Sequence, residues 1–205
     1  MKSTKDYLET SIWFKEPITD PNQIFAEFFT AAALKDYRKR IKAVLSAAFG
    51  KHIWPKNNPG ALLYYFKMME SVINAAWLIN KENKTSPLVI NKEDTFNPNL
   101  FCSWHADSTQ WDFFPKILSF KEYVDPYIVF KRFFKYLSLS AWKVELQDLL
   151  EYALVETSLH EAGMKKDMLS LYFHLCKLVE AAHLIDVREN NHIGGIPKNR
   201  IKTTH

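Results

Sequence analysis

Glycine is scarce in this chain of 205 residues. The sequence contains no GxGxxG dinucleotide fingerprint, no Walker phosphate loop and no GxSxG nucleophile elbow. The most common signatures of nucleotide-binding proteins and hydrolases are therefore absent. The shortage also argues against a β-rich fold, because such folds need glycine in many tight turns. The five glycines are Gly50, Gly60, Gly163, Gly194 and Gly195.

Cysteine and long apolar runs are also limited. The two cysteines, Cys102 and Cys176, are too few for the disulfide framework of a small secreted domain. The first residues lack the apolar core of a signal peptide, and no stretch of about 18 uninterrupted apolar residues occurs. We therefore expect a protein of the reducing cytoplasm that does not enter a membrane.

The charge balance does not define a partner. The net charge of +4 permits contact with an acidic partner but does not require one, because nucleic-acid binding needs a concentrated basic surface. Hydrophobic residues make up 47% of the chain, which is enough to fill a core without disulfides or metals.

The most informative feature is an internal duplication, in which residues 14–85 recur as residues 120–189. Asp20-Pro21 is matched by Asp125-Pro126, and an offset of 105 residues aligns the next thirty positions. Eight of the thirty positions between 20 and 49 are identical to their counterparts, whereas unrelated sequences would share about two. The aligned pairs include Phe25 with Phe130, Phe28 with Phe133, Phe29 with Phe134, Leu45 with Leu150 and Ala48 with Ala153.

Each copy has the pattern of three helices. Apolar residues in 37–48 and 142–153 follow the 3, 4, 7 spacing of a helix with one buried stripe. A shorter helix opened by Asp-Pro precedes each of them, because aspartate is a good N-cap and proline a good first helical residue. The third helices, at about 60–81 and 164–187, are apolar nearly all round, which is typical of helices at the centre of a fold.

The predicted fold class is all-α: a helical bundle built from two pseudo-symmetric copies of a three-helix unit, joined by an ordered, aromatic-rich crossover. We expect breaks between the short and middle helices near Leu34 and Leu139, with Ser140 capping the next helix. The repeats are expected to pack as one globular domain. The segments are the first repeat with its N-terminal extension (1–85), the connector (86–119), the second repeat (120–189) and a basic, partly disordered tail (190–205).

The connector supplies the first candidate site. Its prolines and asparagines interrupt helices, but it is too aromatic for a free linker, and long ordered connections often carry functional residues. The tryptophans would anchor a partner or line a cleft between the repeats, and the histidine and aspartate would form an acid–base pair. The alternative is that the aromatic side chains simply pack onto the bundle. The candidate residues are Trp104, His105, Asp107 and Trp111.

A second candidate site is a basic helix face formed by Lys35, Arg38, Lys39 and Lys42. These four cations share one side of the predicted helix and would follow a phosphate backbone. Their counterparts in the second copy are mostly uncharged, so this basic face is not part of the shared plan. The alternative is an ordinary solvated surface.

Two groups of residues have side chains of the types that bind transition metals, but neither has the spacing of a known metal motif. We therefore expect no metal and no other cofactor. No serine or cysteine has a recognisable nucleophile context, so no catalytic residue is assigned. The two groups are Cys102, His105 and Asp107 in the connector, and Cys176, Glu180 and His183 on one helix face.

These observations favour a non-enzymatic intracellular interaction or regulatory protein, which acts on a protein partner or by self-association. One alternative is a nucleic-acid-binding accessory protein that uses the basic helix face. Another is a small-ligand binder or enzyme with a pocket at the junction of the two repeats.

Overall fold

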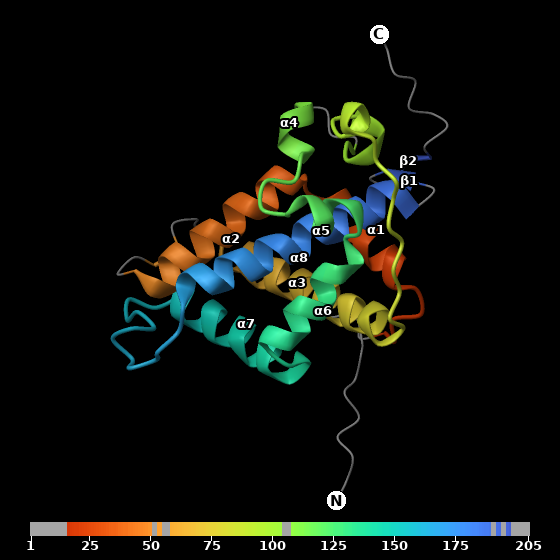
Figure 1. Cartoon of the computed structure of the whole chain (residues 1–205). Coiled ribbons are helices and arrows are strands. Elements are labelled where there is room, and N and C mark those ends of the chain that lie inside the picture. The colour runs from red at the N-terminus through yellow and green to blue at the C-terminus, as the bar shows by residue number, and fades with distance from the viewer. Residues whose placement is uncertain are drawn as a thin grey trace, which may run out of the picture.

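The computed structural model describes residues 16–50, 53–54, 58–103 and 108–189, together with the backbone of 192–193 and 196–197. Within these ranges the protein is mostly helical, which confirms the all-α class (Figure 1). In chain order the elements are α1 (Pro21–Ala31), α2 (Leu34–Phe49), α3 (Pro59–Lys81), η1 (Lys92–Asp94), η2 (Pro98–Leu100), α4 (Gln110–Phe113), α5 (Phe120–Val124), α6 (Tyr127–Tyr136), α7 (Leu139–Ala153), α8 (Met168–Glu189), β1 (His192–Ile193) and β2 (Ile196–Pro197).

The Asp20-Pro21 pair opens α1 as predicted, with Asp20 as the N-cap, whereas α6 begins one residue later than predicted, at Tyr127. The Asp20 carboxylate accepts the Asn22 N–H at 2.9 Å and caps α1. In the same way, Asp125 accepts the Tyr127 N–H at 3.3 Å at the start of α6. Each aspartate therefore satisfies a backbone donor that the first turn of a helix leaves without a partner.

The cap of α7 is not Ser140, as the sequence pattern suggested, but Ser138. The Ser138 hydroxyl accepts the Ala141 N–H at 3.2 Å. Since α7 already begins at Leu139, Ser140 lies in its first turn, where its hydroxyl pairs with that of Ser138 at 3.1 Å.

Helix α8 begins at Met168, four residues later than the apolar pattern suggested. The Asp167 carboxylate accepts the N–H groups of Leu169 and Ser170 at 3.0 and 3.1 Å, which fixes the first turn there. The ammonium group of Lys166 lies within 2.9 Å of both Glu145 and Asp148 on α7. These ion pairs hold the preceding segment against α7.

Helix α8 crosses the middle of the bundle and is buried along most of its length (Figure 1). It packs against α1, α2 and α6, while α3 packs against α1, α6 and α7, and α2 packs against α7. Among the described residues, α8 is the one helix long and apolar enough to cross a membrane. Most of its apolar stretch lies inside the bundle, as in the core helices of globular proteins.

Two buried aromatic pairs join the short helices to the middle helices. The Phe28 ring stacks on Tyr37 with 3.8 Å between centroids, and the Phe133 ring stacks on Trp142 at 4.1 Å. The Tyr37 hydroxyl donates to the Phe28 carbonyl, and the Trp142 indole N–H donates to the Phe133 carbonyl at 3.1 Å. The same contact therefore occurs twice, 105 residues apart.

Backbone hydrogen bonds tie the ends of α2 and α7 together. The Trp54 N–H donates to the Ala153 carbonyl at 2.8 Å, and the Leu159 N–H donates to the Ala48 carbonyl at 2.9 Å. The end of α7 thus accepts a hydrogen bond from the segment after α2, and the end of α2 accepts one from the segment after α7.

The described parts of the connector lie against the bundle. Phe101 and Phe113 are buried with Tyr123 and Leu184 in a small second core. Arg188 of α8 donates to the carbonyl of Leu100 at 2.9 Å. In the expected tail, the described backbone pairs β1 with β2 in antiparallel fashion, and the other tail residues lie outside the described ranges.

Because Phe28 and Phe133 make the same buried contacts, each substitution to alanine should lower the free energy of unfolding by about 3 to 5 kcal/mol. Urea denaturation measures this change. Phe120→Ala is the control, since this ring is 57% exposed and should cost less than about 0.5 kcal/mol. An unchanged stability for either core variant would contradict the stacking of these two rings in the core.

Candidate functional site

Of the four connector residues that the sequence singled out, Trp111 lies in the described part of the chain. Trp104, His105 and Asp107 lie outside it, so the acid–base pair stays a prediction. Trp111 belongs to α4 and is 68% exposed. It lines a surface hollow of about 270 Å³, together with Phe96, Phe101, Gln110 and Phe114.

Helix α4 has only one turn, and side-chain contacts fix its position. The backbone N–H and the hydroxyl of Thr109 both donate to the Asp112 carboxylate, at 2.8 and 3.1 Å. The backbone bond from Thr109 is the main reason that the pKa of Asp112 is lowered. The Lys35 ammonium lies 3.4 Å from the same carboxylate and links α4 to α2. Trp111 is therefore presented from an anchored turn.

The rings beside Trp111 form a cluster that we call the aromatic surface, made up of Phe96, Trp111 and Phe114. Phe114 lies at its centre, with ring centroids 5.3 Å from Phe96 and 6.1 Å from Trp111. Beneath it, Phe101 meets Phe114 edge-on at 5.0 Å. Phe96 is 60% exposed. Two large rings thus remain open to solvent above a packed base, an arrangement that marks many interaction sites.

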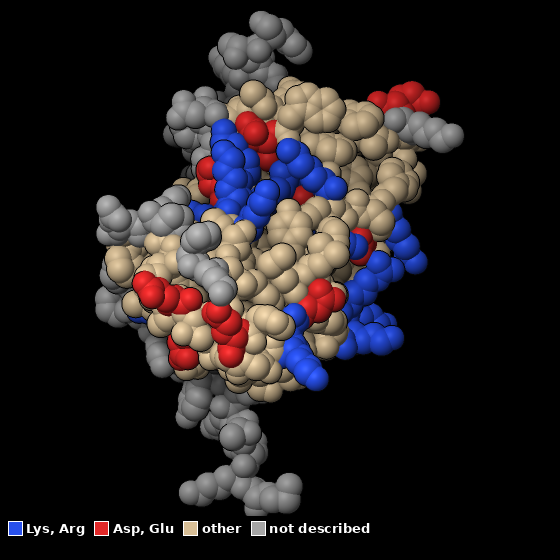
Figure 2. All heavy atoms as spheres, turned by 90° about the vertical axis from the view of Figure 1, so that its left-hand side faces the viewer, with Lys and Arg blue, Asp and Glu red and all other residues tan. Residues whose placement is uncertain are grey.

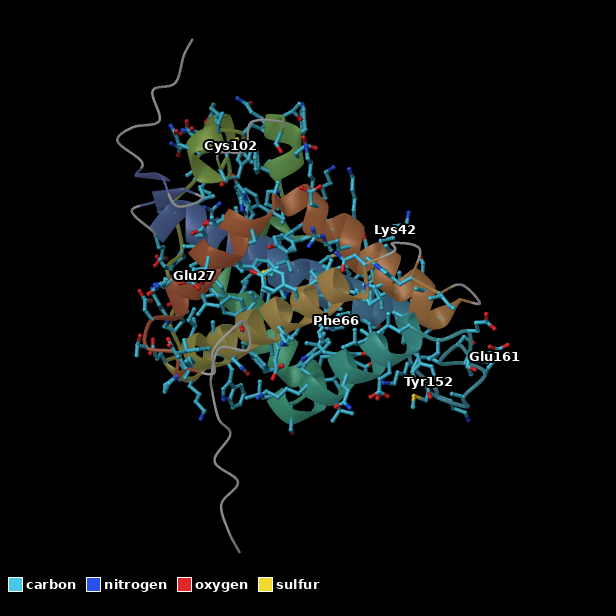
Figure 3. All side chains as sticks on the ribbon, turned by 180° about the vertical axis from the view of Figure 1, so that it is seen from behind. Glu27, Lys42, Phe66, Cys102, Tyr152 and Glu161 are labelled. Carbon is cyan, nitrogen blue, oxygen red and sulfur yellow. The ribbon has the colours of Figure 1, made fainter. Side chains whose placement is uncertain are left out.

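The basic helix face differs from the prediction at Arg38. This side chain is buried, with Nε 2.8 Å from Oε1 of Glu180, and it also donates to the Phe114 carbonyl at 2.7 Å. It therefore does not belong to a solvent-facing row, because its charge is paired inside the protein. Lys39 and Lys42 are exposed, and Lys42 points away from the bundle in Figure 3.

Glu180 is the charged centre of this buried arrangement. Its carboxylate is inaccessible to solvent and also accepts the N–H groups of Lys116, Ile117 and Leu118 at 2.9, 3.0 and 3.2 Å. A buried charge is tolerated when hydrogen bonds and an opposite charge replace its water. Glu180 therefore fastens the end of the connector to α8 and α2.

The metal-type residues of α8 are engaged in other contacts. Glu180 is occupied by Arg38 and by backbone N–H groups, and Nε2 of His183 lies 2.8 Å from the Phe101 carbonyl. Cys176 is buried, and burial raises the pKa of its thiol to about 12, which disfavours a thiolate ligand. In the connector, burial raises the pKa of Cys102 to about 11.

Where the structure describes the junction of the two halves, its interior is tightly filled, while a hollow of about 350 Å³ opens at the surface between α3 and α7. Between α2, α3, α7 and α8 there is a gap of about 10 Å³, lined by residues such as Tyr65 and Leu146. This is space for about one water molecule. The small-ligand alternative therefore finds no cavity at this point of the junction.

A second polar site was not visible in the sequence. A hollow of about 300 Å³ lies between α5, α6 and α8. Glu122 at its base is inaccessible to solvent, and its oxygens lie 2.7 Å from both Nη1 of Arg132 and Nζ of Lys177. The pattern Ser119-x-x-Glu122 signals a capping box, but nothing local indicates the distant partner Lys177. The lining residues are Glu122, Val129, Arg132, Phe173, His174 and Lys177.

Glu122 remains ionised over a wide pH range. Burial opposes its charge, but the hydrogen bonds from Lys177 and from the Ser119 N–H and hydroxyl outweigh burial and lower the pKa to about 2. By contrast, burial and the neighbouring Lys177 lower the pKa of His174, which favours a neutral imidazole. The hollow therefore combines a fixed carboxylate, two cations and a neutral ring.

No family model matches the chain, and no curated protein or solved structure is significantly similar to it.

Arg38→Met should lower the free energy of unfolding by about 3 to 5 kcal/mol, because it leaves Glu180 buried without its partner. Lys39→Met is the matched control on the same helix. It removes one exposed cation and should cost less than about 0.5 kcal/mol. Equal costs in urea denaturation would mean that Arg38 has no structural role.

Stability should also depend on Glu122 in acid. The folded-state pKa of about 2 lies below the ordinary value of 4.5, so the unfolded state takes up the proton first as the pH falls. The contribution is present above about pH 5 and is lost towards about pH 2, with a size on the order of 3 kcal/mol. Comparing the wild type with Glu122→Gln across this range should show their difference shrinking. A constant difference would contradict the assignment.

Proposed function

We propose that this protein is a non-enzymatic interaction protein that binds a protein partner through the aromatic surface. The observation that carries the proposal is the exposure of Phe96 and Trp111, at 60% and 68%, on an anchored base. Aromatic anchors of this kind supply much of the binding energy in protein interfaces. An apolar side chain of the partner would enter the hollow of about 270 Å³ beside them.

The internal contacts of the site support a binding role. Asp112 holds Thr109 and Lys35, so α4 is positioned before a partner arrives. A surface ordered in advance loses less conformational entropy on binding. The buried carboxylates Glu122 and Glu180 are both engaged in structural ion pairs, which does not favour a role for them as a general acid or base.

We also propose that the two halves are pseudo-symmetric copies produced by a tandem duplication. The pairs Phe28–Tyr37 and Phe133–Trp142 support this, since they stack alike at an offset of 105 residues. The hydrogen bonds from Trp54 to Ala153 and from Leu159 to Ala48 give further support, because exchanging the copies converts one into the other. Equal costs for the two phenylalanine substitutions would agree with this proposal.

We further propose that the protein resides in the cytoplasm. The free thiols of Cys102 and Cys176 are compatible with a reducing cytoplasm. Nucleic-acid binding by the predicted basic helix face would now depend mainly on Lys39 and Lys42, because Arg38 and Lys35 are paired within the protein.

A photo-crosslinking amino acid at Trp111 should form one specific protein adduct in cells, because this position lies at the centre of the proposed contact. The same amino acid at Val144, which is 59% exposed on α7, is the matched control. Adding Phe96→Ser should abolish the adduct at position 111. Self-association would appear as an adduct of twice 24.0 kDa and in light scattering.

Identical adducts at positions 111 and 144, or an adduct that survives Phe96→Ser, would contradict the proposed surface. The absence of any adduct at position 111, together with a monomeric mass in light scattering, would do the same.

A further inference from the structure

The strongest surface charge of the second repeat lies on α5 and α6. Lys121, Lys131, Arg132 and Lys135 are all exposed, while Glu122, the carboxylate of these two helices, is buried. In Figure 2, Lys and Arg side chains lie close together along the right-hand edge of the molecule. This edge is the side that faces the viewer in Figure 1, where α5 and α6 lie in front. Positive charge is therefore concentrated here. On α2, by contrast, Arg38 is buried and Lys35 pairs with Asp112 of α4.

The fold does not require these cations. At the aligned positions of α1, 105 residues earlier, Ala26 stands for Lys131, Glu27 for Arg132 and Thr30 for Lys135. Helix α1 forms the corresponding short helix without a single cation. Arg132 pairs with the buried Glu122, but helix formation does not explain the exposed Lys131 and Lys135.

The buried Glu122 carboxylate fixes the two cations that line the hollow beside α6. Glu122 binds the Arg132 guanidinium at 2.7 Å, while that side chain remains 56% exposed. A guanidinium has five N–H donors, so donors remain for an external anion. Lys177 is fixed in the same way from α8, at 2.7 Å from the carboxylate. The two cations are therefore oriented before any ligand binds.

Aromatic rings lie next to these cations. Phe173 is 42% exposed and lines the hollow together with His174. The Tyr136 ring, 39% exposed, stacks on His174 with 4.1 Å between centroids. Exposed rings interleaved with fixed cations are the arrangement by which proteins bind single-stranded nucleic acid, with phosphates on the cations and bases on the rings.

We propose that this surface, formed by Lys131, Arg132, Lys135, Phe173 and Lys177, binds single-stranded nucleic acid. The cations of α6 contact successive phosphates, and Phe173 at the hollow stacks on a base. Burial and the neighbouring Lys177 lower the pKa of His174, which favours an uncharged ring in the hollow. The site shares no residue with the aromatic surface around Trp111, so each can be tested without the other.

The test uses the full chain and a fluorescent oligothymidine of about 20 nucleotides, with anisotropy read between about 50 and 200 mM salt. The double variant Lys131→Ala/Lys135→Thr gives α6 the residues that α1 has at the aligned positions, Ala26 and Thr30. It should reduce the salt slope of log K by about 1.4, since each phosphate contact on a single strand contributes about 0.7.

The control Lys67→Gln/Lys165→Gln removes the same charge at exposed positions of α3 and of the segment before α8, and it should leave the slope unchanged. Phe173→Ala should weaken binding about tenfold at every salt concentration, because a stacking contact is lost. Circular dichroism spectra identical to the wild type show that each variant is folded.

The proposal is overturned if the wild type does not bind the oligonucleotide, or if the two double variants lose the same slope. It is also overturned if Phe173→Ala binds as the wild type does. Binding to phosphatidylserine vesicles without binding to the oligonucleotide would assign the surface to membranes instead.

Discussion

The buried ion pair between Arg38 and Glu180 is the constraint on which the rest of the arrangement depends. It joins α2 to α8 inside the protein, and the same carboxylate binds the backbone from Lys116 to Leu118. That short stretch leads directly into α5. Because a buried charge tolerates little displacement of its partners, the path of the chain into α5 is fixed. The positions of α4 and of the Ser119 cap depend on this anchor.

Two buried carboxylates of the same chemistry have different consequences for the surface. Glu180 is surrounded by donors that are themselves inside the protein, so its charge contributes only to the fold. Glu122 is equally inaccessible, but its partner Arg132 remains half-exposed at the edge of a hollow. Glu180 therefore stabilises the interior of the protein, whereas Glu122 orients cations that face the solvent. This difference separates a structural centre from a surface able to attract anions.

Local patterns in the sequence predicted the helices well but not the partners of charged residues. The apolar stripe at Tyr37 and Ile41 is buried, because a helical period determines which face turns inward. The N-cap of α7 is Ser138 and not Ser140, because two serines so close together do not determine at which of them the helix begins. Arg38 was expected in solvent because its partner Glu180 lies far along the chain. Glu122 was likewise not predicted as a site, because its local capping-box motif gives no sign of the distant partner Lys177.

The crossed hydrogen bonds at the ends of α2 and α7 bear on how the chain folds as it is synthesised. The Trp54 N–H finds its acceptor at Ala153, about a hundred residues later, and the Ala48 carbonyl finds its donor at Leu159. A nascent chain that has only reached the connector lacks both. On the ribosome the first half therefore cannot form these two hydrogen bonds until α7 and the segment after it have emerged.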